Sequence, residues 1–435
     1  MTPCSIDPSR SLLTLFACTT LACTTLACTP DSKSDDELGS GSSDEVGESG
    51  GSDTETLDCS ARPIDIPTPR ADLEGVWDAE RERMVFFAGD QGTPIMCMSQ
   101  TDYTAEVWAF HTDCDNFERI EPGAGMPARG RYALAHDLAH GRALIHGGRT
   151  REGTSGPYTV FDDLWAYELA TDTWTELAKG PSPRSNHVAA IVGNRLVVHG
   201  GNASTDGLVF DPLGDTWAFD LDAETWSQVT TSNDPPARLF HSATVGPDDA
   251  SLVVYGGGDE NAFTMFLHDM WVLQLAADGT SGAWTMLGQG ASPPPGPSSA
   301  DLVLDPARNR LVLWAGHEDN LLGNTNALWA YDLGGGSWSS LITGDLLTGA
   351  SNGFCDFPAD FVTPDLDSPE RRSAGVAVLM DEGETMLIFG GKTDCGLIND
   401  VWSLNLADHV WTERSPATGG EICLRAFANC QTMCF

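Results

Sequence analysis

The chain repeats one short pattern five times, with a sixth and weaker copy near its start. Each copy has an apolar run that ends in Gly-Gly or Ala-Gly, a loop of variable length, a Trp that opens a second apolar run, and in all but the weak copy another Trp further on. The clear copies cover residues 144–174, 196–226, 252–284, 311–338 and 386–411, and the weak copy covers 84–117. A period of this length predicts a repeat architecture in which each unit buries its apolar surface against the next.

Each unit divides into four short apolar segments, and these predict β-strands. The segments are rich in Val, Leu, Trp and Phe and are separated by Gly, Pro, Asp and Asn, as in LVVHGG and TWAFDL. The repeats show no long stretch with a helical apolar period, so we expect an all-β fold. The two tryptophans of a unit fall on its third and fourth segments, where large aromatic surfaces would pack one sheet onto the next.

The pattern resembles the kelch repeat of the galactose oxidase/kelch superfamily. The resemblance rests on the apolar run with Gly-Gly, the spaced Trp pair and a Pro-x-x-Arg lead-in with a nearby His, as in Arg184 with His187 and Arg238 with His241. It covers residues 70–415 and implies a β-propeller of six four-stranded blades. The blades would start near Arg70, Pro127, Pro183, Pro236, Pro297 and Pro369.

Two units depart from the kelch pattern. Phe117 stands where the first unit should have its second Trp, and the fifth unit has Ala315-Gly316 in place of Gly-Gly. A seventh, degenerate blade is the alternative if the insertion 341–369 contributes strands.

The first 58 residues predict export. Residues 1–28 have Arg10 followed by an apolar stretch, as an export signal does, and small residues precede Cys18, Cys23 and Cys28, as in the bacterial lipobox. We expect Cys28 to carry the lipid; Cys23, Cys18 and a plain cleaved signal are the alternatives. Residues 29–58 hold ten Asp or Glu among many Ser and Gly, which indicates a disordered linker. The expected location is the cell envelope or the extracellular surface, with the membrane reached only through the lipid.

Residues 59–435, the predicted propeller, contain eight cysteines, an even number that in an exported chain favours disulfides. A local Cys97–Cys114 bridge and a Cys355–Cys395 bridge are expected. The four others, near the two ends of the propeller or in the tail 416–435, would help to close the ring: Cys59, Cys423, Cys430 and Cys434.

The charge of the predicted propeller excludes one class of partner. Residues 59–435 carry 52 acidic and 21 basic side chains, a net charge of −31. Such a surface repels nucleic acid and anionic lipid. Affinity for Ca²⁺ is the functional alternative to a merely solubilising surface, but the calcium-loop spacing of acidic residues is not found in the sequence.

The sequence does not predict a catalytic or metal site. His146 and His199 occupy a repeated position that is Tyr255, Trp314 or Phe389 in other units, which indicates packing rather than metal binding. Galactose oxidase and glyoxal oxidase, relatives of the kelch fold, use copper with tyrosines and histidines, and kelch-type epimerases act on sugars. A propeller enzyme of either kind, acting on sugars or alcohols with a metal at the channel mouth, is therefore the alternative function. No cofactor is predicted, since copper and Ca²⁺ lack a recognisable ligand set.

The loops between the second and third strands favour a binding function. They are long and unlike one another, and variable loops on a rigid repeated scaffold are common recognition sites. We expect a monomer that binds a protein or a carbohydrate at one mouth of the channel; a structural surface protein is the third possibility. The candidate contact residues are Arg149, Arg151, Tyr158, Phe161, Phe210, Phe263, Phe266, His317 and Lys392.

Overall fold

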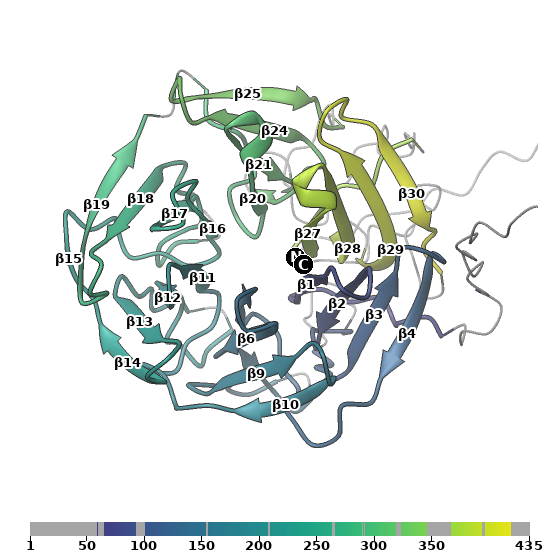
Figure 1. The fold of residues 1–435 in the computed structure, drawn as a ribbon, viewed down its shortest axis with the longest axis horizontal. Helices are drawn as coiled ribbons and strands as arrows, with labels where there is room; N and C mark the ends of the chain where they lie inside the picture. Colours follow the sequence, from purple (N-terminus) through teal and green to yellow (C-terminus); the bar gives the residue numbers. More distant parts are fainter. Residues whose placement is uncertain are drawn as a thin grey trace, which may run out of the picture. The chain divides into compact units, whose positions relative to one another are not determined.

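The protein is a six-bladed β-propeller, seen in a computed structural model. The structure describes residues 59, 65–92, 101–153, 155–207, 209–262, 266–288, 290, 292–318, 323–345, 367–393 and 396–418. Residues 58–435 form one compact unit, and its six sheets surround a central channel (Figure 1). The six predicted blades are confirmed. The alternative seventh blade, most of the insertion 341–369 and most of the tail 416–435 lie outside the described residues.

In blades 1 to 3, four antiparallel strands follow one another in chain order from the channel to the outer edge. Blade 1 consists of β1 (Glu74–Asp78), β2 (Arg83–Phe87), β3 (Val107–His111) and β4 (Asn116–Ile120). Blade 2 consists of β5 (Ala133–Asp137), β6 (Arg142–His146), β9 (Leu164–Glu168) and β10 (Thr173–Glu176). Blade 3 consists of β11 (Val188–Val192), β12 (Arg195–His199), β13 (Thr216–Asp220) and β14 (Thr225–Gln228).

Blades 4 to 6 keep this order with small additions. Blade 4 consists of β16 (Ser242–Val245), β17 (Ser251–Tyr255), β18 (Met270–Leu275) and β19 (Ser281–Leu287). Blade 5 consists of β20 (Asp301–Asp305), β21 (Arg310–Trp314), β24 (Leu328–Asp332) and β25 (Ser337–Ile342). Blade 6 consists of β27 (Val376–Met380), β28 (Thr385–Thr393), β29 (Gly396–Asn405) and β30 (Trp411–Ser415).

Two blades therefore exceed the predicted four strands. In blade 4, β15 (Thr230–Ser232) lies parallel to β19 at the outer edge, and in blade 6, β26 (Arg372–Ser373) extends the pairing of β28. Two hairpins decorate the loops between second and third strands: β7 (Arg149–Thr150) with β8 (Thr159–Val160) in blade 2, and β22 (His317–Glu318) with β23 (Gly323–Asn324) in blade 5. Short 3-10 turns, η2 (Pro306–Arg308) and η4 (Asp381–Gly383), join the first two strands of blades 5 and 6.

The second tryptophan of each unit packs onto the preceding blade, as predicted. Its partner is the residue just before the glycine motif, and this contact explains why that position is always aromatic or His. Ring centroids are 4.6–5.5 Å apart in the pairs Trp174–Phe87, Trp226–His146, Trp284–His199, Trp338–Tyr255 and Trp411–Trp314. His146 and His199 are fully buried in these seams, which confirms their packing role.

A buried arginine anchors the start of five blades. In blade 2, Arg129 donates to both carboxylate oxygens of Asp163 at 2.6 and 2.7 Å and to the Gly147 carbonyl, while Trp165 donates to the same carboxylate at 2.8 Å. The equivalent Arg–acid pairs are Arg70–Glu106, Arg184–Asp215, Arg238–Asp269 and Arg372–Asp400. Blade 5 has Pro297 and Ala327 at these positions, so it lacks the arginine and the acid together.

The second glycine of each motif needs a backbone conformation that other residues rarely adopt. Its φ lies between 84° and 111° in all six blades, and its N–H donates to the next blade, as Gly148 does to the carbonyl of Arg184 at 2.9 Å. The first position has a lower φ, 54° at Ala88 and 60° at Ala315, which an alanine can reach. The Ala-Gly departure of blade 5 is therefore structurally neutral.

A closed ring of six backbone hydrogen bonds surrounds the channel. The residue two places after each lead-in position has a φ of 49–58° and donates its N–H to the equivalent carbonyl of the preceding blade, over 2.8–3.1 Å. The six residues are Asp72, Arg131, Asn186, Phe240, Ser299 and Ala374. Because the backbone is fixed in the same way at all six, their side chains can vary without changing the ring.

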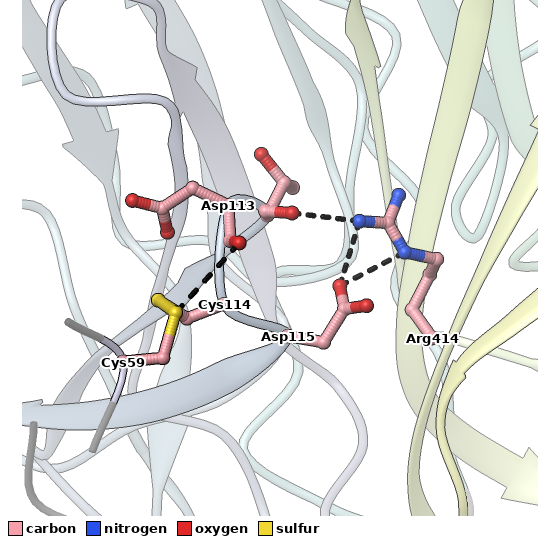
Figure 2. Close-up of a disulfide and its surroundings, with 6 residues drawn as sticks. Cys59, Asp113, Cys114, Asp115 and Arg414 are labelled. Carbon is pink, nitrogen blue, oxygen red and sulfur yellow. Dashed lines mark hydrogen bonds and ion pairs between the residues drawn. A yellow bond between two sulfur atoms is a disulfide. The ribbon is translucent and has the colours of Figure 1, made fainter. Parts of the chain in front are cut away.

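Blade 6 joins blade 1 without exchanging a strand among the described residues. Instead, Phe86 stacks on Phe389 at 4.1 Å between centroids, and the Arg70 carbonyl accepts from Gly391. In the turn between β3 and β4, Asp115 forms an ion pair with Arg414 of β30 at 2.7 Å, and the Thr112 carbonyl accepts a hydrogen bond from the same guanidinium (Figure 2).

One disulfide, Cys59–Cys114, is present in the described part of the chain, with the two Cα atoms 5.5 Å apart (Figure 2). The predicted Cys97–Cys114 bridge is therefore wrong, and Cys59 is not available for a bond to the C-terminal tail. The short distance through space between Cys59 and the β3–β4 turn could not be read from their separation of 55 residues. Cys97, Cys355, Cys395, Cys423, Cys430 and Cys434 lie outside the described residues, as does Cys28.

Candidate binding site at the channel mouth

The first strands of the six blades enclose a cavity of about 580 Å³ along the channel. Its wall mixes apolar and polar side chains and includes four carboxyl groups: Asp72, Glu74 of β1, Asp301 of β20 and Glu382. Burial raises the pKa of Asp301 to about 7. Loss of bulk solvent inside the channel, followed by the charge of Asp301, raises the pKa of Glu74 above its usual value, although the Glu74 side chain remains exposed to the channel.

The charged residues of the site gather at one mouth of this channel, where the blades begin and where the loops between second and third strands lie. The Asp72 carboxylate accepts from Arg131 at 2.9 Å and from Lys392 of blade 6 at 2.8 Å. Although burial opposes it, the attraction of these two cations keeps the pKa of Asp72 well below its usual value. On the other side of Arg131, the ring of Phe240 lies 5.3 Å from the guanidinium carbon.

Arg149 is the unusual residue of this mouth. It is only 3% exposed, and its Nε and Nη1 lack a hydrogen-bond partner in the part of the chain that the structure describes. Its guanidinium stacks on the ring of Tyr158 at 3.9 Å. Burial, and next the charge of Arg131, lower the pKa of Arg149, although a guanidinium stays charged at any physiological pH.

The surroundings of Arg149 hold it in place without neutralising it. Tyr158 is buried, and its backbone N–H donates to the Thr205 carbonyl of blade 3 at 2.8 Å. The guanidinium carbon of Arg151 also lies over the Tyr158 ring, 4.4 Å from its centroid. An unpaired buried charge is costly, since it has lost water and gained no counter-ion. The two unpaired nitrogens are closed to solvent and Arg149 does not line the channel cavity, so an anionic group reaches them only after the surrounding side chains move.

Four of the predicted contact residues come together at the mouth: Arg149, Arg151, Tyr158 and Lys392. Two others are packing residues. Phe161 lies under the lead-in Arg129 at 3.9 Å, and Phe210 packs edge-on against Phe240 at 5.6 Å. His317 lies in the β22–β23 hairpin with its Nδ1 2.9 Å from Asn324, and Phe266 is half-buried beside Gly258. Phe263 lies outside the described residues.

Sequence reasoning missed Asp72, Arg131 and Phe240, which belong to the closed backbone ring. The residue type at these positions differs from blade to blade, so a search for repeated residues passes over them. The usable signal is their fixed place, two residues after each lead-in arginine. Tyr103 was also missed; it lies close to Gly130 and interacts electrostatically with Arg149 and Arg131.

Two further sequence expectations can be placed. Over the described ranges, no group of three or more His, Cys, Asp or Glu has the geometry to hold a metal ion. The described residues also contain no helix long and apolar enough to cross a membrane, and the predicted export signal 1–28 lies outside them.

The fold and mouth define a kelch propeller, and the sequence matches a family of this class. Residues 51–245, 107–296 and 215–353 match the KLHDC2/KLHL20/DRC7 Kelch-repeats domain, so the matches together span more than half of the chain. The chain belongs to this kelch-repeat family, whose propellers are protein-interaction modules.

Its curated relatives share the propeller rather than their whole length. Adagio protein 3 of Arabidopsis thaliana is 32% identical over 40% of this chain and 27% of the relative. Leucine-zipper-like transcriptional regulator 1 homolog of Drosophila melanogaster is 25% identical over 61% of this chain and 24% of its own length. Human Kelch domain-containing protein 1 is 25% identical over 46% of this chain and 50% of its length. The chain therefore spans half or less of these relatives.

Proposed function

We propose that this chain is an exported interaction module that binds a segment of a partner protein at the channel mouth, where a carboxylate of the partner pairs with Arg149. The observation that supports the proposal is the buried guanidinium of Arg149, which stacks on Tyr158 and whose Nε and Nη1 find no hydrogen-bond partner among the described residues. A bidentate carboxylate satisfies a guanidinium in geometry and in charge. The ring of Phe240 offers an apolar surface on the other side of Arg131 for the residues that flank the carboxylate.

The local charge supports an anionic ligand although the protein is strongly acidic. At the mouth, Arg131 and Lys392 pair with Asp72, Arg149 interacts electrostatically with Arg131 and Asp72, and Arg151 stacks on Tyr158. A second buried carboxyl group, Asp90, interacts with Asp72 and Lys392, so four cations face two acids. Acidic side chains elsewhere repel an anionic protein as a whole. The expected partner therefore carries one exposed Asp, Glu or terminal carboxylate on a segment that is otherwise neutral or basic.

A selection from a displayed random-peptide library tests this proposal. The bait is the full chain, and the matched variants are Arg149→Met and Arg119→Met, the latter removing a half-exposed arginine of β4. We expect the wild-type protein and Arg119→Met to select peptides that share an acidic group. Arg149→Met should bind them about 10- to 100-fold more weakly, as expected when a charged hydrogen bond is lost.

Equal binding by Arg149→Met would contradict the proposal. A parallel screen of a glycan array, with the same two variants, addresses the carbohydrate alternative. An acidic sugar carries the same carboxylate, so Arg149-dependent binding to acidic glycans without peptide selection would move the partner class to carbohydrate.

Export and lipidation form the second part of the proposal. The Cys59–Cys114 disulfide supports export, because such bonds persist in oxidising compartments. We propose that residues 1–28 direct export and that Cys28 carries the lipid that anchors the protein at the cell envelope. Mass spectrometry of the mature N-terminus tests this directly. A lipid-modified Cys28 that is lost in Cys28→Ser supports it, whereas an unmodified N-terminus at another residue contradicts it.

A further inference from the structure

The two ends of blade 1 face opposite ends of the channel. The strand registers align Phe87 with Val107 at the mouth end and Arg83 with His111 at the other end. The turn between β3 and β4 follows His111 directly and contains Cys114. Cys114 therefore lies on the face opposite the mouth, about one five-residue strand, or roughly 17 Å, away.

Between Cys59 and Arg70, the chain passes from the face opposite the mouth to the mouth itself. Cys59 is exposed and bonded to Cys114, and Asp65 then bridges Phe117 near the start of β4. Next, the Pro67 carbonyl accepts from Asn399 of blade 6 at 2.8 Å. Arg70 then lies at the mouth, where blade 1 begins.

The turn to which Cys59 is bonded is itself fixed. Arg414 of blade 6 donates to Asp115 and to the Thr112 carbonyl, at 2.9 and 2.7 Å, on either side of Cys114 (Figure 2). The bond thus attaches the N-terminal segment to a turn that two blades hold, at the seam that closes the ring.

We infer that the Cys59–Cys114 disulfide fixes the point at which the chain enters the propeller, at Cys59 on the face opposite the mouth. The residues before Cys59 are thereby attached at that face and not at the mouth. This inference rests on the proposed function only for the purpose of keeping the mouth clear. Without the disulfide, the next contacts among the described residues are at Asp65 and Pro67, so the entry point would shift towards the mouth and become variable.

Distance measurements between pairs of spin labels test the inference. In the full chain, one label replaces Asp58 by a genetically encoded amino acid, and the second replaces either Glu80, in the β1–β2 turn of the far face, or Asp102, on the mouth side. With the disulfide intact, we expect a narrow 58–80 distribution centred at a shorter distance than 58–102. In Cys59→Ser/Cys114→Ser, and in the wild-type protein under mild reduction, both distributions should broaden at least twofold.

Two results would overturn the inference: a 58–102 distance shorter than the 58–80 distance in the oxidised chain, or distributions that neither the double substitution nor reduction alters. Peptide binding at the mouth, measured on the same samples, separates this outcome from the proposed function. Unchanged peptide affinity in Cys59→Ser/Cys114→Ser shows that the mouth is intact, independently of any change in the distances from position 58.

Discussion

Phe117 of blade 1 packs edge-on against Phe389 of blade 6, with ring centroids 5.8 Å apart. This pair occupies the seam at which the other five blades use their second tryptophan. The departure of the first unit from the repeat pattern therefore preserves the contact with a smaller ring. Because strands are not exchanged between blades 1 and 6 in the described residues, this pair and the Phe86–Phe389 stack close the propeller together with backbone hydrogen bonds such as that from Gly391 to Arg70.

The closing seam should accordingly depend on Phe117. Replacement by Ala leaves a cavity between two blades and should lower the free energy of unfolding by about 3–5 kcal/mol. Chemical denaturation of the oxidised protein measures this loss. Phe117→Trp, which restores the residue of the other five seams, is the matched control and should lose much less. An unchanged denaturation midpoint in Phe117→Ala would show that this contact does not close the ring.

The lead-in ion pairs should behave as coupled units. The side chains of Arg372 and Asp400 are only 2% and 6% exposed, so removing one of them leaves the other as an unpaired buried charge. Arg372→Met should lower the free energy of unfolding by about 3–5 kcal/mol. In Arg372→Met/Asp400→Ala, no charge remains unpaired, as in blade 5 with Pro297 and Ala327. The double variant should therefore be more stable than the sum of the single losses; strict additivity in a double-mutant cycle would refute the coupling.

Four buried histidines should make the propeller sensitive to mild acid. Burial lowers the pKa of His146 and of His199 to about 3, against 6.5 for the free side chain, and lowers those of His187 and His241 still more clearly. The unfolded chain thus binds more protons below pH 6.5, and stability falls as the pH falls. Each such histidine contributes a slope of about 1.4 kcal/mol per pH unit below that point.

The measurement compares unfolding at pH 7 and pH 5 in the wild-type protein and in His146→Phe/His199→Phe. Phe occupies the same seam position at Phe87 and Phe389, so it fits the site. This range lies above the normal pKa of the paired aspartates, whereas Asp301, whose pKa is raised, favours the folded state as the pH falls. The difference between the two proteins isolates the histidines. We expect a flatter pH dependence in the double variant, and equal slopes would contradict the assignment.

Much of the fold follows from the sequence because its determinants repeat. The blade count, the strand order and the packing role of His146 and His199 all come from positions that recur in each unit, and both histidines are fully buried. The acid two residues before the first tryptophan also recurs and pairs with the lead-in arginine. It could have been found by noting that blade 5 lacks both partners.

The mouth is less predictable because its residues differ between blades. Arg149 and Lys392 were among the predicted contact residues, but Arg131 and Asp72 are brought together by a backbone ring that only the closed propeller creates. Aromatic residues such as Phe161 suggested contact with a ligand, yet Phe161 packs on Arg129. The Cys59–Cys114 bond depends on a similar closure, since a segment before the first strand reaches the far turn of the same blade.

The two kinds of buried arginine give the most direct test of the account, which holds that Arg149 is kept for a ligand and Arg372 for the fold. The measurement is the free energy of unfolding of Arg149→Met and Arg372→Met, side by side in the absence of any ligand. Because Arg149 is buried and forms no ion pair with the described residues, its replacement should leave the protein equally stable or up to about 4 kcal/mol more stable, whereas Arg372→Met should be destabilised. A similar destabilisation in both variants would contradict the account, because Arg149 would then be a structural residue and not an empty binding position.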